Sequence, residues 1–299
     1  MNDGANILHS KLKEKQILRV AGAFDAMSAK LVELNNFDAI WAGSFAISAT
    51  YALPDASILT MTEFLSVASN MADTCSIPVI ADCDTGFGGP SNVSHMVKKY
   101  ENAGIAAISI EDKIFPKQNS LLQNGTQKIL PEKDFVAKLI AAKNAKINEN
   151  FLIIARVEAL IAGLGVSEAR KRADAYEKAG ADAILIHSKK NTPDEIFEFC
   201  DTWDGKIPII VIPTSYPNVT LDELQNHKVK MVIYANQSLR ASHWAMAEHL
   251  GKLSTAKSLS DVETKMTTME DIFHLQEMYE IKKQEIEIEK NLKKLGYIN

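Results

Sequence analysis

Short apolar segments alternate with longer amphipathic segments along most of this chain. Each apolar segment is about five residues long and fits a strand that is buried on both faces, because almost every position in it is apolar. The eight predicted strands cover residues 17–21, 39–42, 78–81, 106–110, 152–155, 183–186, 209–212 and 231–235. A helix-like stretch follows each strand. Eight such units predict an α/β fold, a closed (β/α)₈ barrel of the TIM type, whose usual size is about 250 residues.

The ends of the predicted helices agree with this repeat. Residues 60–63, Thr-Met-Thr-Glu, have the pattern of a capping box at the start of a helix. A helix over residues 167–179 is predicted to stop at Gly180, and the same phrase recurs around Gly104, where a glycine again leads into a strand. A doubly wound open sheet is the second candidate, but it usually has a glycine-rich phosphate turn after its first strand. Residues 22–25, Gly-Ala-Phe-Asp, form no such turn, so the barrel is favoured.

Polar side chains follow several of the predicted strands, at the end of the barrel where active sites lie. Asp82 and Asp84 follow the third strand and Glu111 follows the fourth. Carboxylates from adjacent strands suit one Mg²⁺ ion, which prefers hard oxygen ligands. Arg156 and His187 follow the fifth and sixth strands and suit an anionic group. The sequence therefore predicts a site for a small, multiply charged anion between a metal ion and a guanidinium group.

Each of these residues also has a structural interpretation. The alternative role of Asp82 and Asp84 is to cap the following helix. His187 belongs to a residue type that often forms structural hydrogen bonds. Arg156 would pair with Glu158, two residues later, or with another carboxylate of the barrel. The sequence alone leaves these alternatives open.

A long polar loop, residues 113–130, follows the fourth strand. It contains Pro116 and Gly125 and shows no helix or strand periodicity. Loops longer than about 12 residues without such periodicity are often active-site lids. We predict a lid that keeps water from the reacting groups. A disordered insertion is the alternative.

Composition and charge narrow the choice of function. The chain has 299 residues, of which 46% are hydrophobic, and a net charge of −5 with interspersed signs. This charge pattern does not predict a basic surface that would bind nucleic acid or an acidic membrane. The apolar runs are far shorter than the roughly 20 residues of a membrane span, and no signal peptide is expected. The three cysteines, Cys75, Cys83 and Cys200, lack metal-binding spacing, so we expect a cytoplasmic protein with reduced cysteines and no zinc.

Four motifs resemble those of a known family. They are Asp82-Cys83-Asp84-Thr85-Gly86-Phe87-Gly88, Glu111-Asp112-Lys113-Ile114-Phe115-Pro116-Lys117-Gln118-Asn119-Ser120, Ala155-Arg156-Val157-Glu158-Ala159 and His187-Ser188-Lys189-Lys190. On these motifs the chain resembles the phosphoenolpyruvate mutases of the isocitrate lyase superfamily, over roughly residues 15–290. The carbon–carbon lyases of that superfamily carry a catalytic cysteine in a Lys-Lys-Cys-Gly-His type loop. The loop here has no cysteine, which argues against isocitrate or methylisocitrate cleavage.

The resemblance implies a Mg²⁺-dependent phosphomutase that interconverts phosphoenolpyruvate and phosphonopyruvate, the first step of phosphonate biosynthesis. It implies that Asp82 anchors the metal ion and that Asp84 and Glu111 bind it through water. The implied substrate-binding residues are Gly43, Ser44, Ser120, Arg156 and His187. The implied catalytic residues are Asp55, Lys117, Asn119, Arg156 and His187. Gly43 and Ser44 would cover the substrate carboxylate or enolate, Asn119, Arg156 and His187 would hold the phosphoryl group, and Lys117 would reach in when the loop closes.

Other activities of the same superfamily are the alternatives. Phosphonopyruvate hydrolases resemble the mutases but have threonine at the position of Asn119, so asparagine favours the mutase. The turn at residues 42–45, Ala-Gly-Ser-Phe, departs from the Ser-Gly-Leu of many relatives, and the spacing to Asp55 differs, which bears on the contacts of Gly43 and Ser44. A carbon–carbon lyase or oxaloacetate decarboxylase would leave Asn119 unexplained. A non-catalytic binding protein would not need the complete set of ligands.

The last part of the chain differs in composition. We expect a barrel domain over residues 1–255 and a helical extension over residues 256–299, with a capping box at Thr267 to Glu270. An apolar stripe follows, formed by Ile272, Phe273, Leu275, Met278 and Tyr279. Such a stripe needs a partner surface. The resemblance implies a homodimer or homotetramer with an exchanged C-terminal helix, and coupling to an enzyme that consumes phosphonopyruvate.

Overall fold

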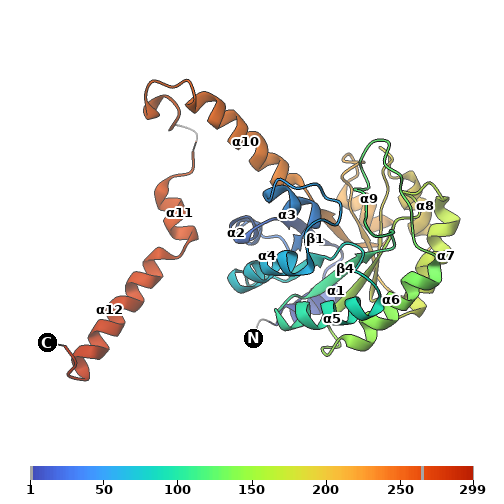
Figure 1. Cartoon of the computed structure of the whole chain (residues 1–299), viewed down its shortest axis with the longest axis horizontal. Coiled ribbons are helices and arrows are strands. Elements are labelled where there is room, and N and C mark those ends of the chain that lie inside the picture. Colours follow the sequence, from blue (N-terminus) through green and yellow to red (C-terminus); the bar gives the residue numbers. More distant parts are fainter. Residues whose placement is uncertain (1–2, 264–265, 299) are drawn as a thin grey trace. The chain divides into compact units, whose positions relative to one another are not determined.

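The computed structural model describes residues 3–263 and 266–298. Its strands form a closed barrel in sequence order, in which β8 pairs with β1 (Figure 1). The strands are β1 Leu18–Ala23, β2 Ala39–Ala42, β3 Val79–Asp82, β4 Ala107–Glu111, β5 Leu152–Val157, β6 Ala183–Ile186, β7 Ile209–Val211 and β8 Val229–Tyr234. All neighbouring strands are parallel. Each of the eight predicted strands is present, and the predicted (β/α)₈ fold is confirmed.

Helices connect the strands and cover the outside of the barrel. They are α1 Gly4–Glu14, α2 Ala26–Leu34, α3 Ser44–Thr50, α4 Met61–Thr74, α5 Pro90–Asn102, α6 Glu132–Ala145, α7 Gly165–Lys178, α8 Asp194–Thr202 and α9 Leu221–Asn226. Thr60 and Glu63 form the predicted capping box before α4. Gly104 and Gly180 have φ angles of +77° and +99°, which glycine adopts without steric cost, so the predicted helix stops are confirmed.

The hydrophobic core has two layers. An outer layer packs between the strands and the helices and includes Cys83. An inner layer fills the barrel, where Leu18, Trp41 and Ile154 are buried together with Leu8 of α1. Because apolar side chains fill most of the barrel interior, the charged side chains of the site lie at one end of it.

The chain divides into two compact units, Met1–Ala241 and Ser242–Asn299. The second contains most of α10 Gln237–Leu253, a 3₁₀ turn η1 Leu259–Asp261, α11 Met269–Leu275 and α12 Met278–Lys294. The predicted boundary after residue 255 falls within this unit and stays a prediction. None of the helices in the two described ranges is both long and apolar enough to cross a membrane.

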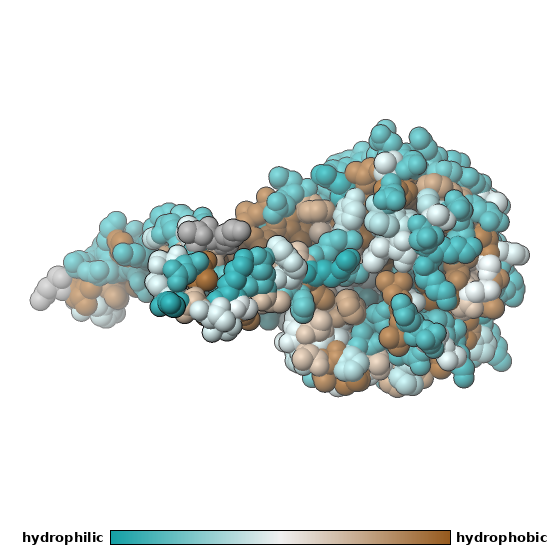
Figure 2. All heavy atoms as spheres, turned by 90° about the horizontal axis from the view of Figure 1, so that it is seen from above, coloured by the Kyte–Doolittle hydropathy of each residue, from teal (hydrophilic) through white to brown (hydrophobic). Residues whose placement is uncertain are grey.

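The C-terminal helices differ from the prediction in two details. The residue that caps α11 is Thr268, which accepts from the backbone of Asp271, and the expected cap at Thr267 is wrong. The apolar stripe is also not on one helix, because Glu277 has a φ angle of +55° and separates α11 from α12. Hydrophobic side chains are exposed on this unit (Figure 2); on α12 they include Met278, Ile281, Ile288 and Leu292. The exchange of a helix between subunits stays a prediction.

Candidate active site

The carboxyl ends of the strands bring the predicted polar residues together. Asp82 and Glu111 are the last residues of β3 and β4, Arg156 lies in β5 opposite Glu111, and His187 follows β6. All four residues are buried. Their burial at one end of a closed barrel places charged groups where solvent screening is weak, so electrostatic interactions there are strong.

Three carboxylates lie on one side of this end. Asp82 accepts hydrogen bonds from the hydroxyl of Ser44, at 2.9 Å, and from its backbone nitrogen, at 3.4 Å. Asp84 has a left-handed φ angle of +50°, which aspartate tolerates better than most residues. Asp84 Oδ2 and Glu111 Oε1 are buried and have no hydrogen-bond partner among the described residues. Buried oxygens of this kind call for a ligand, an ion or water.

These carboxylates fit a hydrated magnesium ion. Within residues 3–263 and 266–298, no three acidic, histidine or cysteine side chains converge as a ready-made set of direct metal ligands. Mg²⁺ usually keeps several waters and binds through one or two carboxylates. The carboxylate oxygens of Asp82, Asp84 and Glu111 are therefore suited to a metal ion held partly through water. Asp84 Oδ2 and Glu111 Oε1, which lack a hydrogen-bond partner in the part of the chain that the structure describes, are free to accept from such water.

Lys117 lies among these acidic groups. Its ammonium nitrogen is 2.5 Å from Asp84 Oδ1 and 2.9 Å from Asp55 Oδ1, and it donates to Ser44 Oγ at 3.0 Å. Burial lowers the pKa of Lys117, but the charges of Asp84 and Asp55 outweigh burial and hold its pKa well above the usual range. Burial raises the pKa of Asp55, but the charge of Lys117 outweighs burial and holds the pKa of Asp55 below its usual value. Lys117 is therefore a fixed cation at the barrel mouth.

Asn119 is held beside Lys117. Its Nδ2 donates to Asp55 Oδ2 at 2.8 Å, and its Oδ1 accepts from the backbone nitrogen of Leu121 at 3.0 Å. The two contacts fix the side-chain amide, with oxygen and nitrogen each matched to a suitable partner. Since an amide nitrogen has two N–H groups, the second can be offered to a ligand.

Arg156 and His187 lie next to these carboxylates, in β5 and directly after β6, and Arg156 Nε is 3.4 Å from Glu111 Oε2. Arg156 Nε donates to Glu158 Oε1 at 2.5 Å, so the pairing left open by the sequence is present. Arg156 Nη2 lies 2.8 Å from His187 Nδ1, and that nitrogen lies 2.9 Å from Glu158 Oε1. Burial lowers the pKa of His187, and the charge of Arg156 adds to this effect. His187 is therefore neutral at neutral pH and can still donate one hydrogen bond from its ring.

Two of the predicted substrate-binding residues, Ser120 and Ser44, are already engaged in hydrogen bonds, and a third, Gly43, lies close to Trp41. The Ser120 hydroxyl donates to Glu158 Oε2 at 2.7 Å and accepts from Lys113 at 2.6 Å and from Arg156 at 3.1 Å, which fills its hydrogen-bonding capacity. Ser44 is bound to Asp82 and Lys117. Gly43 precedes α3, and a side chain there would begin 2.8 Å from the indole nitrogen of Trp41. Their roles as substrate ligands stay predictions.

The loop of residues 113–130 brings Lys117 and Asn119 to the mouth. Its two ends are joined, since Ile114 donates to the carbonyl of Lys128 at 3.1 Å and Leu130 donates to that of Asp112 at 2.7 Å. The backbone of Lys117 also donates to Ser57 Oγ, at 3.1 Å, across the mouth. The loop is thus folded against the barrel instead of forming a separate insertion. Its movement as a lid stays a prediction.

Several buried charged residues were not identified as functional candidates from the sequence. The Asp112 carboxylate is fully buried and accepts from Tyr176 at 2.7 Å and from Arg172 at 3.2 Å, both on α7. Arg172 also donates to the carbonyl of Leu130 at 3.0 Å, so it holds both ends of the loop. Lys113 is buried beneath the loop. In the sequence these residues resemble a solvated charged segment, and the available signal was only their position next to the predicted carboxylates.

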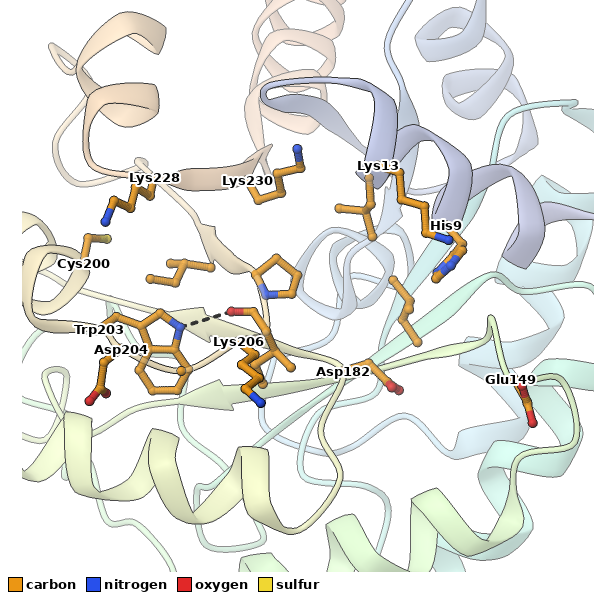
Figure 3. A pocket seen from close by; sticks show the side chains of 16 residues that line it. His9, Lys13, Glu149, Asp182, Cys200, Trp203, Asp204, Lys206, Lys228 and Lys230 are labelled. Atoms are coloured by element: carbon orange, nitrogen blue, oxygen red, sulfur yellow. Dashed lines mark hydrogen bonds between the residues drawn. The ribbon is translucent and has the colours of Figure 1, made fainter.

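A separate pocket of about 810 Å³ lies at the other end of the barrel (Figure 3). Its lining includes His9 and Lys13 of α1, Lys228 directly before β8, Lys230 within β8, and Trp203. These positions adjoin the amino ends of the strands. Because catalysis in this fold takes place at the carboxyl ends, we assign no catalytic role to this pocket.

Comparison with known proteins shows the family to which this chain belongs. The family described as phosphoenolpyruvate phosphomutase matches residues 8–254. The phosphonopyruvate hydrolase of Variovorax sp. (strain Pal2) is 44% identical over 90% of this chain and 93% of its own. A crystal structure of phosphoenolpyruvate phosphomutase from Streptomyces platensis subsp. rosaceus is 42% identical, with a TM-score of 0.93 over 95% of this chain and 99% of its own. A structure of phosphonopyruvate hydrolase with oxalate and Mg²⁺ is 41% identical, with a TM-score of 0.89 over 95% and 98% of the two chains. The chain therefore belongs to the phosphoenolpyruvate phosphomutase family.

Proposed function

We propose that this enzyme catalyses the Mg²⁺-dependent interconversion of phosphoenolpyruvate and phosphonopyruvate. The observation that carries the proposal is the position of Asn119, whose amide is fixed by Asp55 beside the buried ammonium group of Lys117. A fixed amide donor next to a cation suits a phosphoryl group that must be held and returned to the same pyruvate skeleton. The relative with Mg²⁺ in its structure supports the choice of metal ion.

The residues divide into two groups. Asp82, Asp84 and Glu111 would hold Mg²⁺, which would supply the positive charge that favours the enolate form of pyruvate. The phosphoryl oxygens would be held by Arg156, His187, Lys117 and Asn119. Asp55 orients Lys117 and Asn119 through the two contacts described above.

Positioning accounts for most of the catalysis in this scheme. Phosphoryl transfer passes through a loose transition state that needs little covalent assistance, so fixed cations and hydrogen-bond donors carry the effect. The phosphoryl group must move between the enol oxygen and carbon 3 without meeting water. The folded loop and the burial of Lys117 and Arg156 support the exclusion of water from the mouth.

Phosphonopyruvate hydrolysis is the second candidate, because a phosphonopyruvate hydrolase is 44% identical to this chain. The two reactions share the substrate and the first bond cleavage, and they differ in whether water or the enolate accepts the phosphoryl group. A carbon–carbon lyase or oxaloacetate decarboxylase is less well supported, because the loop of residues 113–130 has no cysteine.

Phosphorus NMR distinguishes these reactions directly. With phosphonopyruvate and Mg²⁺, we expect a phosphoenolpyruvate resonance to grow, and a chelator to prevent its growth. We expect Asn119→Thr to increase the share of orthophosphate, because one amide donor is lost. Orthophosphate and pyruvate from the unmodified enzyme, without phosphoenolpyruvate, would assign the hydrolase instead. If phosphonopyruvate is not consumed, both the mutase and the hydrolase reaction are excluded.

The pH dependence of metal binding gives a second test. Burial raises the pKa of Glu111 to about 7, against the opposing charges of Arg156 and Lys117. Glu111 is thus largely protonated below pH 7 in the metal-free protein, whereas a metal ion favours its carboxylate form. We expect the Mg²⁺ affinity to rise with pH up to about 7, by at most about tenfold per pH unit, and then to level off.

Isothermal titration calorimetry measures this effect. Titrations in two buffers with different ionisation enthalpies should reveal close to one proton released per Mg²⁺ bound at pH 6 and almost none at pH 8.5. Glu111→Gln, which cannot release that proton, is the control and should lose this dependence. An affinity of the unmodified protein that does not change between pH 6 and pH 8 would contradict the role of Glu111.

We further propose an assembly and a metabolic setting. The exposed hydrophobic side chains of α12 support a homodimer or homotetramer in which this surface is covered. In the cytoplasm, phosphonopyruvate formation would be coupled to an enzyme that consumes phosphonopyruvate, since the equilibrium is expected to favour phosphoenolpyruvate. Sedimentation of the full-length protein tests the assembly, and a monomer at micromolar concentration would refute it.

A further inference from the structure

The carboxylate of Glu158 contacts two different parts of the barrel mouth. Its Oε1 accepts from Arg156 Nε at 2.5 Å and lies 2.9 Å from His187 Nδ1, on the walls of the barrel. Its Oε2 accepts from Ser120 Oγ at 2.7 Å and lies 3.3 Å from the ammonium nitrogen of Lys113, both of which belong to the loop. One carboxylate oxygen therefore contacts the barrel wall and the other contacts the loop, so Glu158 connects the loop to the barrel.

Lys113 holds the loop from beneath. Its side chain is 2% exposed, and its ammonium group donates to the carbonyl of Gln118 at 2.8 Å and to Ser120 Oγ at 2.6 Å. With Glu158 as the third contact, all three N–H groups of the ammonium have partners. The segment of residues 114–120 thus wraps around one buried cation. Asn119 lies between the two residues that Lys113 binds.

The charges around Glu158 are mutually dependent. Burial raises the pKa of Glu158, but the charges of Arg156 and Lys113, together with the hydrogen-bond contact to His187, outweigh burial and hold the pKa well below its usual range. A buried ion pair often adds little stability over well-packed apolar side chains of the same volume, whereas loss of one partner leaves a buried charge unpaired. An arrangement of this kind is therefore better explained by the geometry it imposes than by the stability it adds.

We infer that Lys113 and Glu158 are positioning residues, which set the location of Asn119 on the loop relative to Arg156 and His187 on the barrel. The inference deepens the proposed function, because these are the groups proposed to hold the phosphoryl group. Neither Lys113 nor Glu158 needs to touch the substrate. Their hydrogen-bonding groups face the loop, Arg156 and His187.

The test compares Lys113→Met with Lys128→Met. Methionine keeps the apolar part of the side chain and removes the ammonium group. Lys128 lies in the same loop with an exposed side chain, so it is a matched control. For Lys113→Met we expect kcat, with phosphonopyruvate as substrate, to fall about 10²-fold with KM changed by only a few-fold, because the reacting groups are misplaced while the metal-side carboxylates are intact. Lys128→Met should match the unmodified enzyme.

Limited proteolysis supplies a measurement that does not depend on the reaction. Chymotrypsin can cleave beside Leu121 and Leu122, which are exposed on the loop and unchanged in both variants. We expect Lys113→Met to be cleaved there at least about tenfold faster than Lys128→Met, since loosened segments open more often. Equal cleavage rates would overturn the inference, whether or not kcat falls. An unchanged kcat in an active enzyme would also overturn it.

A second variant covers the case in which Lys113→Met does not fold. Ser120→Ala removes the hydroxyl that bridges Lys113, Glu158 and Arg156 but leaves all charges paired, and it should give the same pattern with smaller changes. If the unmodified enzyme has neither mutase nor hydrolase activity, the proposed function fails, whereas proteolysis still decides the role of Lys113. Loop cleavage that is the same in Ser120→Ala and in the unmodified enzyme would then overturn the inference.

Discussion

Asp82→Ala should abolish Mg²⁺-dependent turnover while the barrel remains folded. Asp82 ends β3, and its Oδ2 is oriented by both the hydroxyl and the backbone nitrogen of Ser44. Loss of this oriented carboxylate removes the main anchor proposed for the metal ion. Because loss of one preorganised electrostatic group commonly costs about 10²–10³-fold in rate, we expect kcat to fall by at least about a thousandfold. Phosphorus NMR with phosphonopyruvate measures this loss.

The fold is expected to survive because the strand itself is unaffected. Asp82→Ala leaves the Ser44 hydroxyl with one partner fewer, which costs about 1–3 kcal/mol in the free energy of unfolding. Urea unfolding followed by circular dichroism gives this value. Asp222→Ala, at an exposed position of α9, is the control and should keep full activity. Turnover of Asp82→Ala at the normal rate would remove Asp82 from the metal site.

Lys117→Met should lower both activity and stability. Lys117 is the cation between Asp55 and Asp84, and its removal leaves two buried carboxylates without their ion pair. Breaking a buried ion pair by removing one partner typically costs about 3–5 kcal/mol. We expect a loss of this size in the free energy of unfolding of the metal-free protein, measured by urea unfolding. We expect kcat to fall at least about a hundredfold, because the loop loses its fixed cation at the mouth.

The pH dependence of unfolding separates this effect from simple loss of packing. Lys117 holds the pKa of Asp55 below its usual value, and this contribution to stability is present above the unfolded-state pKa and is lost as the pH falls through the folded-state pKa. The stability difference between Lys117→Met and the unmodified protein should therefore shrink as the pH is lowered below about 4. A difference that stays constant from pH 7 to pH 3 would show that charge is not the cause. Lys128→Met should show no difference at either pH.

The barrel was predictable because its signal is local and repeated. An almost wholly apolar run of about five residues fits a strand that is buried on both faces. Eight such strands can form either a closed barrel or one large open sheet. The errors lie at the strand ends. Strand β1 continues to Ala23 and β5 to Val157, beyond the predicted ends at residues 21 and 155. Gly22 and Arg156 interrupt the apolar runs, yet they and the residues after them pair with neighbouring strands.

The C-terminal helices were less predictable. The predicted cap was Thr267, and the neighbouring threonine, Thr268, differs from it by one residue of helix register. The structure uses Thr268, whose hydroxyl accepts from Asp271 at 3.1 Å. Glu277, which has a left-handed backbone conformation, then interrupts the helix, so the apolar stripe is divided between α11 and α12. Glutamate is a good helix former, so its local propensity pointed the other way.

The sequence by itself determined the fold, the order of the strands and the identity of the polar residues at their carboxyl ends. It placed Asp82, Glu111, Arg156 and His187 at one end of the barrel, because strand ends follow from local patterns. Only the tertiary structure decided which charges meet. The contacts of Lys113 with Glu158, and of Asp112 with Arg172, join segments tens of residues apart in the sequence. A buried charge is stable only beside a partner, and the closure of the chain in space decides which partner comes within reach.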